Sequence, residues 1–400
     1  MNKGPEITRG KTKALYEHPD QKDTLVVAQF DNISAGDGAR RNTIPGKGRI
    51  AAKTTSRVFR LLNLCGLPTH YLRGGEDDDD NEMLVRRCTM IPLEVVVRGV
   101  AAGSLVKRKP GIGRGSVIVP RMVEFFIKDD ANHDPLIEPD EIVRRGLATP
   151  QEIGVMSEIA RLTFEILSHA WRRRDTLLVD MKVEFGRLAG GEGDGQLVIA
   201  DVIDNDAWRI WPQGREELML DKQMYRNLSE VTQADLDRVL AAYERVAEAV
   251  ATFPQMRPGM VAVIMDGPEH QAQADAVVAA IRQYGLPTVK RVASARVTPS
   301  YALQLVQQLD ATFGRLVYVP AEGVHSRLGD LIEEATASPV FRVSHVEPAA
   351  VALAAAKAFA VEDTVLFGRV LLVQANARSA IVSADAVAAA PPPPPSGTLA

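Results

Sequence analysis

Short apolar runs alternate with connections of unequal length through the first half of the chain. Apolar residues at helical spacing predict two long helices, over Arg49–Leu64 and Ile153–Arg173. Apolar runs bounded by turn residues predict strands at Leu25–Phe30, Met83–Cys88, Leu93–Arg98, Leu177–Phe185 and Leu197–Ile203. Loops, rather than regularly alternating helices, separate most of these strands, which favours an α+β fold with mainly antiparallel sheets.

The pattern becomes regular after the Pro- and Gly-containing residues 254–259. Strands and helices then alternate, which is typical of a three-layer α/β domain with a parallel sheet. The expected strands are Met260–Met265, Thr288–Ala293, Leu316–Val319 and Phe341–Val346. The expected helices are His270–Tyr284, Ser300–Leu309 and another before the last strand, and the alanine-rich stretch 349–390 is also expected to be helical. We therefore expect one domain over residues 1–253, a linker over 254–259, a second domain over 260–390, and a disordered Pro-rich tail over 391–400.

Charge and cysteine content exclude several classes of function. The net charge of −4 and pI near 6.0 give no global attraction to nucleic acid or anionic membranes. The two cysteines, Cys65 and Cys88, lack the spacing of a zinc site or a disulfide framework. No secretory signal opens the sequence, and no apolar run approaches the roughly 20 residues of a membrane helix. We expect a cytoplasmic protein with neither nucleic acid nor membrane as a partner.

The most informative chemistry lies in residues 179–185, where apolar and charged residues alternate strictly. On a strand, Asp180, Lys182 and Glu184 share one face in steps of about 7 Å. A solvent-washed face is one interpretation. The other is a site for magnesium and nucleotide phosphates, because Asp is disfavoured in strands and a lysine between two carboxylates suits such a ligand. The glycine-rich residues 190–195 would turn the chain back and bring Asp201 beside Asp180 or Glu184.

A basic segment near the start, RGKTK, is superficially similar to a phosphate loop. Pro5 stands where that loop requires its first glycine, which excludes it. Lys11 and Lys13 still alternate onto one face of a short hairpin, where both could point at phosphates. A solvated basic turn is the alternative.

The segment Arg98–Arg108 places small residues, including Gly103 and Ser104, between guanidinium groups. Small side chains let a ligand approach the backbone, and arginine offers a planar fork to a phosphate or carboxylate. Two polar loops, Ser34–Arg40 and Lys128–Pro135, also carry charged residues, but spacing alone assigns them no role.

Taken together, these segments resemble the phosphoribosylaminoimidazole-succinocarboxamide synthetase (SAICAR synthetase) family. IPLEVVVR followed by AAGS is similar to one signature of that family, and LVDMKVEFG to the other. RGKTKALY, SAGDGAR and FFIKDDANHDP fit the same family in the right order. The resemblance covers about residues 7–250. The segment ADVIDNDAWRIWP is similar to the form in animal bifunctional enzymes, although Val202 stands where many bacterial relatives have glutamate.

The resemblance implies roles for individual residues. Lys11, Lys13 and Lys182 would contact the ATP phosphates, and Met90 would lie against adenine. Glu184 and Asp201 would hold magnesium, with Glu184 also counted among the nucleotide-binding residues. Asp180, Lys182 and Lys128 would be the catalytic residues, Asp180 lying close to the reacting carboxylate. The residues expected to bind the acceptor ribotide or line the remaining pocket are Ser34, Asp37, Arg98, Ser104, Asp134, Asp206, Arg209, Lys222 and Arg226.

The implied activity is an ATP- and Mg²⁺-dependent ligase of purine synthesis. It would join carboxyaminoimidazole ribotide to L-aspartate and release ADP and phosphate. Such a reaction needs positioning and charge neutralisation more than a protein nucleophile, which fits the absence of a Ser-His-Asp or Cys-His set. A different ATP-dependent ligase or kinase, and a nucleotide-binding scaffold protein without turnover, are the alternatives.

Residues 260–345 resemble the aminoimidazole ribotide (AIR) carboxylase domain to which animal SAICAR synthetases are fused. The motifs of that family are altered here: acidic Asp266 and Glu269 lie in the first phosphate loop, and Arg296 replaces a histidine. Added carboxylates should repel a ribotide phosphate. We expect a domain without carboxylase activity that serves in assembly of a homo-oligomer; retained carboxylase activity and a regulatory ligand-binding module are the alternatives.

Overall fold

The computed structural model describes residues 1–36, 38–77, 80–129, 132–256, 261–265, 271–292, 317–318, 341–342 and 347–388. The chain forms two compact units, Met1–Arg257 with Val361–Val365, and Pro258–Ala360 with Leu366–Ala400. No helix within these described segments is both long and apolar enough to cross a membrane.

The first unit opens with a five-stranded antiparallel sheet in the order β1–β2–β3–β7–β6. Helix α1 (Lys47–Cys65) packs against this sheet and ends at Gly66, whose φ of 97° is the left-handed conformation common after a helix. A separate hairpin follows β3. The strands are β1 Glu6–Arg9, β2 Lys13–Glu17, β3 Thr24–Gln29, β4 Asn32–Ala35, β5 Arg40–Thr43, β6 Tyr71–Gly74 and β7 Glu82–Arg86.

A second, six-stranded sheet runs in the order β10–β9–β8–β11–β12, with β13 also paired to β11. All of its pairs are antiparallel. The strands are β8 Cys88–Val100, β9 Val117–Ile127, β10 Leu136–Ile137, β11 Thr176–Leu188, β12 Leu197–Ala200 and β13 Trp208–Pro212. Strand β11 therefore has β8 as one neighbour and both β12 and β13 as others, which makes it the centre of the sheet.

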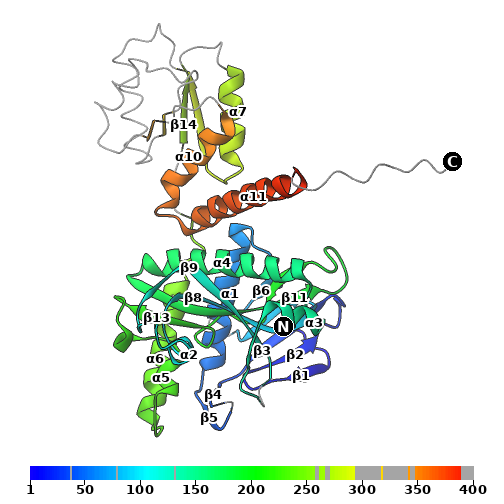
Figure 1. Ribbon diagram of the computed structural model, residues 1–400, viewed down its shortest axis with the longest axis vertical. Helices are drawn as coiled ribbons and strands as arrows, with labels where there is room; N and C mark the ends of the chain where they lie inside the picture. The colour runs from blue at the N-terminus through cyan, green and yellow to red at the C-terminus, as the bar shows by residue number, and fades with distance from the viewer. Residues whose placement is uncertain are drawn as a thin grey trace, which may run out of the picture. The chain divides into compact units, whose positions relative to one another are not determined.

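Helix α4 (Pro150–Arg172) lies across the second sheet (Figure 1) and packs against β8, β9 and β11. It starts with a capping box in which Thr149 and Glu152 each accept the other's backbone N–H. Helix α6 (Gln233–Val250) has the same kind of start and packs against α1. The short helices are α2 Ser104–Arg108, α3 Pro139–Arg144 and α5 Gln223–Arg226, together with the 3-10 turn η2 Glu216–Leu218.

The predicted α+β class with antiparallel sheets is confirmed for this unit. The boundaries differ at specific residues. Cys88 begins β8 rather than ending the preceding strand. Strand β12 ends at Ala200, earlier than expected, because Asp201 has a left-handed φ of 66°. Strands β9 and β13 were not predicted, since their patterns lack a clean apolar alternation.

The described part of the second unit contains two parallel strand pairs. The bounds are β14 Val261–Met265, α7 Gln271–Arg282, β15 Thr288–Val292, β16 Val317–Tyr318, β17 Phe341–Arg342, α10 Pro348–Ala360 and α11 Thr364–Ala388. Helices α7 and α10 pack together around a core that includes Val277, Ile281 and Val351. The stretch 349–390, expected to be helical, forms two helices that are separated around Asp363, a residue type unfavourable inside helices.

Several predictions for the second unit fall on undescribed residues. The helix Ser300–Leu309, the altered phosphate-loop residues Asp266 and Glu269, Arg296 and the tail 391–400 all lie outside the described segments. The full parallel sheet of the second domain therefore stays a prediction.

Candidate functional site

Strand β11 carries the expected row of charged residues, and the row is buried. Asp180 is 5% exposed and Glu184 is 3% exposed, which overturns the interpretation of a solvent-washed face. In the register with β8, Asp180 lies opposite Arg98 and Glu184 lies opposite Glu94. Buried charges are costly unless they are paired, so each member of the row needs a partner.

At one end of the row, lysines and carboxylates form a cluster. The ammonium of Lys182 lies 2.5 Å from Oε1 of Glu94 and 3.2 Å from Oε1 of Glu184. Lys128, which directly follows β9, donates a 2.6 Å hydrogen bond to the second oxygen of Glu184. Two lysines therefore hold the two carboxylate oxygens of Glu184.

The same cluster receives Lys13 from the first sheet. The ammonium of Lys13 forms an ion pair with Asp201, the residue that follows β12. Glu184 pairs with Ala200 in the register of β11 and β12. Asp201 directly follows Ala200, so it lies one position along from the partner of Glu184. Of the two positions expected for Asp201, the one beside Glu184 fits this register. Asparagine and aspartate tolerate left-handed φ better than most residues, which suits the sharp turn at Asp201.

The electrostatics of this cluster are those of carboxylates crowded among cations. Burial and the neighbouring charge of Asp201 raise the pKa of Glu184, against the opposing effect of the lysines. Burial also acts to raise the pKa of Asp201, but Lys13, Lys182 and Lys128 outweigh it and hold that pKa well below its usual range. The pKa of Lys182 is raised: burial lowers it, and Glu184 and Glu94 more than compensate. Lys182 is therefore a cation at neutral pH.

The donor set at this end fits Mg²⁺ together with a nucleotide. Glu184 and Asp201 supply carboxylate oxygens, the ligands that Mg²⁺ prefers, and magnesium commonly takes only one or two carboxylates plus phosphate oxygens and water. No group of three or more His, Cys, Asp or Glu side chains suited to a metal occurs among the described residues, so a dedicated protein cage is not part of this arrangement. Lys13, Lys128 and Lys182 each form an ion pair with a carboxylate of this cluster.

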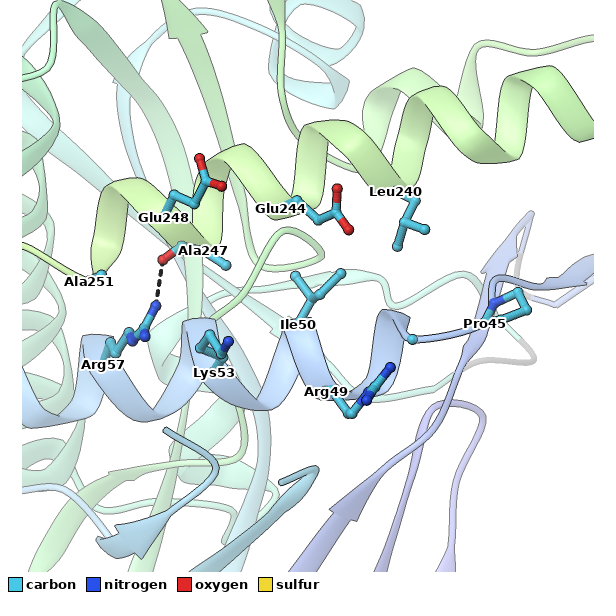
Figure 2. A pocket seen from close by; sticks show the side chains of 11 residues that line it. Pro45, Arg49, Ile50, Lys53, Arg57, Leu240, Glu244, Ala247, Glu248 and Ala251 are labelled. Carbon is cyan, nitrogen blue, oxygen red and sulfur yellow. Dashed lines mark hydrogen bonds between the residues drawn. The ribbon is translucent and has the colours of Figure 1, made fainter. Parts of the chain in front are cut away.

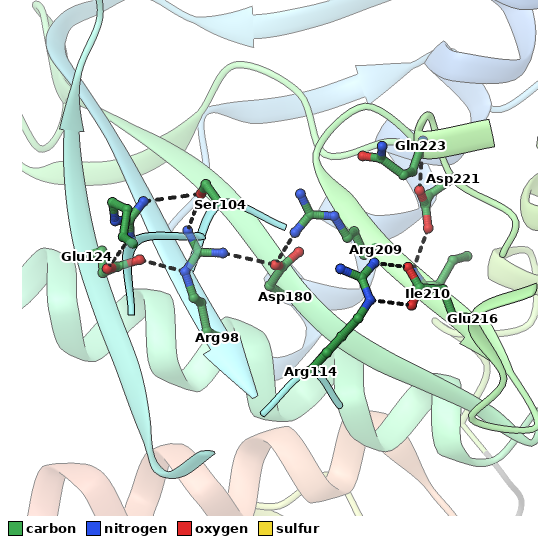
Figure 3. Close-up of polar contacts among 11 residues, drawn as sticks. Arg98, Ser104, Arg114, Glu124, Asp180, Arg209, Ile210, Glu216, Asp221 and Gln223 are labelled. Atoms are coloured by element: carbon green, nitrogen blue, oxygen red, sulfur yellow. Dashed lines mark hydrogen bonds and ion pairs between the residues drawn. The ribbon is translucent and has the colours of Figure 1, made fainter. Parts of the chain in front are cut away.

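The other end of the row is an arginine cluster (Figure 3). Oδ2 of Asp180 accepts hydrogen bonds from Arg209 and, at 3.1 Å, from Arg98. The Arg98 guanidinium, with its side chain 4% exposed, also donates to Oγ of Ser104 at 3.3 Å. Asp180 and Glu184 are about 13 Å apart along one strand. One strand thus joins an arginine-rich end to a lysine-rich end.

The close approach of Arg209 to the backbone depends on Gly103. Its φ of 56° is in the left-handed region, and a Cβ there would lie 2.3 Å from Nη2 of Arg209. The small residues of this segment were predicted to let a ligand approach the backbone. In the structure the guanidinium of Arg209 lies beside the backbone at Gly103.

A third group lies on the segment between β12 and α5. Asp206 accepts hydrogen bonds from Lys222 at 2.8 Å and from the hydroxyl of Tyr243 at 2.9 Å. Burial raises the pKa of Asp206, but the cations of Lys47 and Lys222 and these hydrogen bonds bring it well below its ordinary value. Asp204 accepts the backbone N–H of Asp206 at 2.8 Å, which fixes the turn.

The remaining expected residues lie near these clusters or support them. Oδ1 of Asp134 accepts the backbone N–H of Asp129 at 2.8 Å, so Asp134 shapes the loop that begins at Lys128. Met90 is 41% exposed and lies opposite Gly186 in the β8–β11 register.

Lys11 lies in the turn before β2 and Ser34 lies in β4. Arg226 ends α5, and its backbone N–H donates a 3.1 Å hydrogen bond to the carbonyl of Lys222. Asp37 lies outside the described residues.

A groove of about 670 Å³ between α1 and α6 contains none of the expected residues (Figure 2). The basic side chains Arg49, Lys53 and Arg57 line it from α1, and Glu244 and Glu248 line it from α6. Because its walls carry opposite charges, we interpret it as a polar contact between two helices and assign it no ligand.

Sequence reasoning missed Glu94, Glu124 and Lys47, all of which contact or act on the clusters. Glu94 stands alone as a charge in the apolar run 91–97, which was an available signal. Lys47 is 2% exposed at the start of α1, and nothing in its local pattern distinguishes it from a surface lysine.

Comparison with known proteins decides the family. The sequence profile described as SAICAR synthetase matches residues 6–242. The chain belongs to the SAICAR synthetase family. A phosphoribosylaminoimidazole-succinocarboxamide synthase of Roseiflexus castenholzii is 48% identical over 247 residues, which are 62% of this chain and 96% of that protein. The resemblance stated from the motifs is thereby confirmed for the first unit.

The similarity of this SAICAR synthetase family member to bifunctional enzymes extends further along the chain. A bifunctional phosphoribosylaminoimidazole carboxylase/succinocarboxamide synthetase of Drosophila melanogaster is 37% identical over 350 residues, 86% of this chain and 80% of that protein. Among solved structures, a synthase from Ehrlichia chaffeensis has a TM-score of 0.56 at 29% identity, covering 63% of this chain and 100% of that one. A SAICAR synthetase in complex with ADP has a TM-score of 0.53 at 32% identity, covering 61% and 96%.

Proposed function

We propose that residues 1–253 form a SAICAR synthetase. This unit would condense 5-amino-1-(5-phosphoribosyl)imidazole-4-carboxylate with L-aspartate and convert ATP to ADP and phosphate. The observation that carries the proposal is the buried row of β11, which joins a lysine-and-carboxylate cluster at Glu184 to an arginine cluster at Asp180. Family membership of residues 6–242 agrees with it.

The lysine end is assigned to ATP. Lys13, Lys128 and Lys182 neutralise the phosphate oxygens, and a related SAICAR synthetase has been solved with ADP. Glu184 and Asp201 would hold Mg²⁺, which when bound supplies charge neutralisation at the phosphates. Met90, half exposed opposite Gly186, is assigned to the adenine. Lys11, in the turn before β2, is assigned to the phosphates.

The arginine end is assigned to the acceptor ribotide. Arg98, Arg209 and Ser104 offer the planar donors and hydroxyl that phosphate and carboxylate groups bind. Asp180 accepts hydrogen bonds from both guanidiniums with one oxygen, and it is itself assigned a place close to the reacting carboxylate. Asp206, Lys222 and Arg226 are assigned to the rest of the ribotide, and Ser34, Asp37 and Asp134 to the remaining pocket.

The chemistry needs no protein nucleophile. A carboxylate oxygen of the ribotide attacks the γ-phosphorus of ATP, the bond to ADP breaks, and an acyl phosphate forms. The amine of aspartate then attacks the carbonyl carbon, the C–N bond forms, phosphate leaves, and the nitrogen loses a proton. The cations of the lysine end stabilise charge in the first step, and the arginine end holds the ribotide in place for both steps.

The test is ADP release by the full chain with ATP, Mg²⁺, L-aspartate and the carboxylated ribotide, omitting each in turn. Release that requires all of them, with the succinocarboxamide accumulating, is the expected result. Release indifferent to aspartate and the ribotide would point to a different ligase or kinase, and ATP binding without turnover would point to a scaffold protein. Either result would reject the proposal.

For residues 260–390 we infer an AIR carboxylase-like domain without carboxylase activity that assembles the chain into a homo-oligomer. The inference is supported by similarity to a bifunctional relative over 86% of the chain and by the acidic residues at 266 and 269. A carboxylase assay on the purified chain should give no product; product formation would reject the inference. Light scattering should give a mass of at least twice 43.5 kDa, and the mass of one chain would reject the inferred assembly.

A further inference from the structure

The arginine cluster contains two residues that the proposed reaction does not use, Glu124 and Arg108. Glu124 lies in β9 with its side chain 9% exposed, and Arg108 is the last residue of α2 with its side chain 29% exposed. Both contact residues assigned to the acceptor ribotide.

Glu124 connects two arginines through its two oxygens. Oε2 accepts a 2.5 Å hydrogen bond from Nε of Arg98, and Oε1 accepts a 2.5 Å hydrogen bond from Nη2 of Arg108 (the Glu124–Arg98 bond is drawn in Figure 3). Burial acts to raise the pKa of Glu124, but the hydrogen bonds from both arginines hold it below its ordinary value. Glu124 is therefore an anion at neutral pH whose two oxygens are both occupied by protein groups.

Ser104 provides a second connection between the same arginines. Its Oγ accepts from Nη2 of Arg98 at 3.3 Å and from Nη1 of Arg108 at 3.1 Å. The Glu124 carboxylate and the Ser104 hydroxyl thus each accept hydrogen bonds from both guanidinium groups, which fixes the groups relative to each other. Long side chains normally lose rotational freedom when they bind an anion, and a pair that is already fixed avoids that cost.

The two arginine side chains differ in how accessible their guanidinium groups are to a ligand. Arg98 is 4% exposed, and its Nε, Nη1 and Nη2 all donate to Glu124, Asp180 and Ser104. Arg108 is 29% exposed, and its guanidinium lies over the Phe126 ring at 5.3 Å, which holds the planar group in place. Arg108 is the more accessible cation beside Ser104.

We propose that Arg108 directly binds the phosphate of the acceptor ribotide and that Glu124 is the positioning residue that holds Arg98 and Arg108 in the orientation for it. The proposal rests on the proposed function, because the phosphate is that of its acceptor substrate. A phosphate of ATP has the same chemistry, and the test distinguishes the two.

The test compares Arg108→Met and Glu124→Gln with two controls from a nearby ion pair outside the cluster. Arg114 and Glu216 form that pair, with Arg114 Nε 2.8 Å from Glu216 Oε2, and the controls are Arg114→Met and Glu216→Gln. Each variant is assayed with the ribotide and with the riboside that lacks the phosphate. Arg108→Met and Glu124→Gln should raise the KM for the ribotide by roughly 10- to 100-fold, the loss expected for a hydrogen bond to a charged group. The KM for ATP and the kcat/KM for the riboside should not change, and the controls should match wild type.

Equal losses on ribotide and riboside would mean a structural role only, and would overturn the proposal. A rise in the KM for ATP instead would assign the phosphate to the nucleotide and overturn it as well. If Glu124→Gln does not fold, Glu124→Asp and the more exposed Arg108→Met remain as tests, and Glu124→Asp should recover part of the ribotide affinity.

Binding of inorganic phosphate, followed by calorimetry, separates this proposal from the proposed function. It needs no turnover, so it can be measured even if the wild-type chain does not use aspartate and the ribotide. Arg108→Met should weaken phosphate binding by a factor similar to its effect on the ribotide KM, and Arg114→Met should not. Unchanged phosphate binding in Arg108→Met would overturn the assignment of Arg108.

Discussion

Lys182 on β11 lies between two carboxylates that face each other across neighbouring strands: Glu94 on β8, at 2.5 Å, and Glu184 on β11, at 3.2 Å. Like charges directly opposite each other destabilise a sheet, and the shared ammonium offsets that repulsion. The pKa of Lys182 is raised because Glu184 and Glu94 outweigh the lowering effect of burial. Glu94 thus draws Lys182 away from full pairing with Glu184, the carboxylate assigned to magnesium.

Glu94→Gln should impair the use of MgATP. Without the charge of Glu94, the lysine pairs more strongly with Glu184 and competes with the metal for that carboxylate. We expect the Mg²⁺ concentration for half-maximal ADP release to rise by roughly 10-fold, which is about 1.4 kcal/mol. The KM for the ribotide should be unchanged. Glu94→Asp is the matched control, and an unchanged Mg²⁺ dependence in Glu94→Gln would contradict the role given to Glu94.

The shared face of Asp180, Lys182 and Glu184 was predictable because side chains of a strand alternate with a period of two. Their partners were not predictable from that pattern. Asp180 meets Arg209 because β13 pairs with β11 beyond an irregularity between Leu178 and Asp180. Strand pairing between distant segments, rather than local periodicity, decides which charge lies at which end.

Lys47 is a second residue whose partners could not be predicted from the local sequence. The helix that contains it was predicted from apolar spacing, but its burial depends on Tyr243 of α6, which lies far along the chain and has its ring centroid 5.6 Å from the ammonium. The start of the helix is fixed by Asp31, whose oxygens accept the backbone N–H groups of Gly46 and Gly48. Local sequence predicted the helix, and only tertiary packing assigned the lysine to the buried carboxylates.

Lys47→Met should destabilise the protein strongly. Burial acts to raise the pKa of both Asp204 and Asp206, and the charge of Lys47 opposes that effect on each, so that the pKa of Asp206 is lowered overall. Removing one partner from a buried group of charges costs about 3–5 kcal/mol of the free energy of unfolding. Urea denaturation measures it, with Lys22→Met at an exposed position as a control expected within about 1 kcal/mol of wild type. Equal stability of the two variants would contradict the account of Lys47.

Asp221 gives a pH-dependent prediction. Its carboxylate is 1% exposed and accepts the backbone N–H groups of Ile210 and Gln223 (Figure 3). Burial raises its pKa from 3.8 to about 6, against the lowering effect of those hydrogen bonds. The folded protein therefore holds this proton more tightly than the unfolded chain. Its contribution to stability is fully present below the unfolded pKa and is lost as pH rises through about 6.

As pH rises from the unfolded to the folded pKa of Asp221, the loss in free energy of unfolding should reach about 3 kcal/mol. Denaturation of the wild type and of Asp221→Asn at several pH values between 4 and 7 isolates the effect as a difference in slope. Asp221→Asn should be less stable overall but should lack this part of the slope. Asp237→Asn, at an exposed position of α6, should keep the wild-type slope. Parallel profiles for the wild type and Asp221→Asn would show that Asp221 titrates as an ordinary carboxyl.

Gly103→Ala should disturb the arginine cluster and weaken ribotide binding while the nucleotide site is retained. At φ 56° and ψ −133° an alanine is strained by roughly 1–3 kcal/mol, and its Cβ would lie 2.3 Å from the Arg209 guanidinium. Arg209 must then move and lose its hydrogen bond to Asp180. We expect the KM for the ribotide to rise by at least roughly 10-fold, the loss of one charged hydrogen bond, while the KM for ATP stays near wild type. Gly111→Ala is the control, because a Cβ there meets nothing within 4 Å. Ribotide kinetics that are the same in both variants would mean that the position of Arg209 does not matter for acceptor binding.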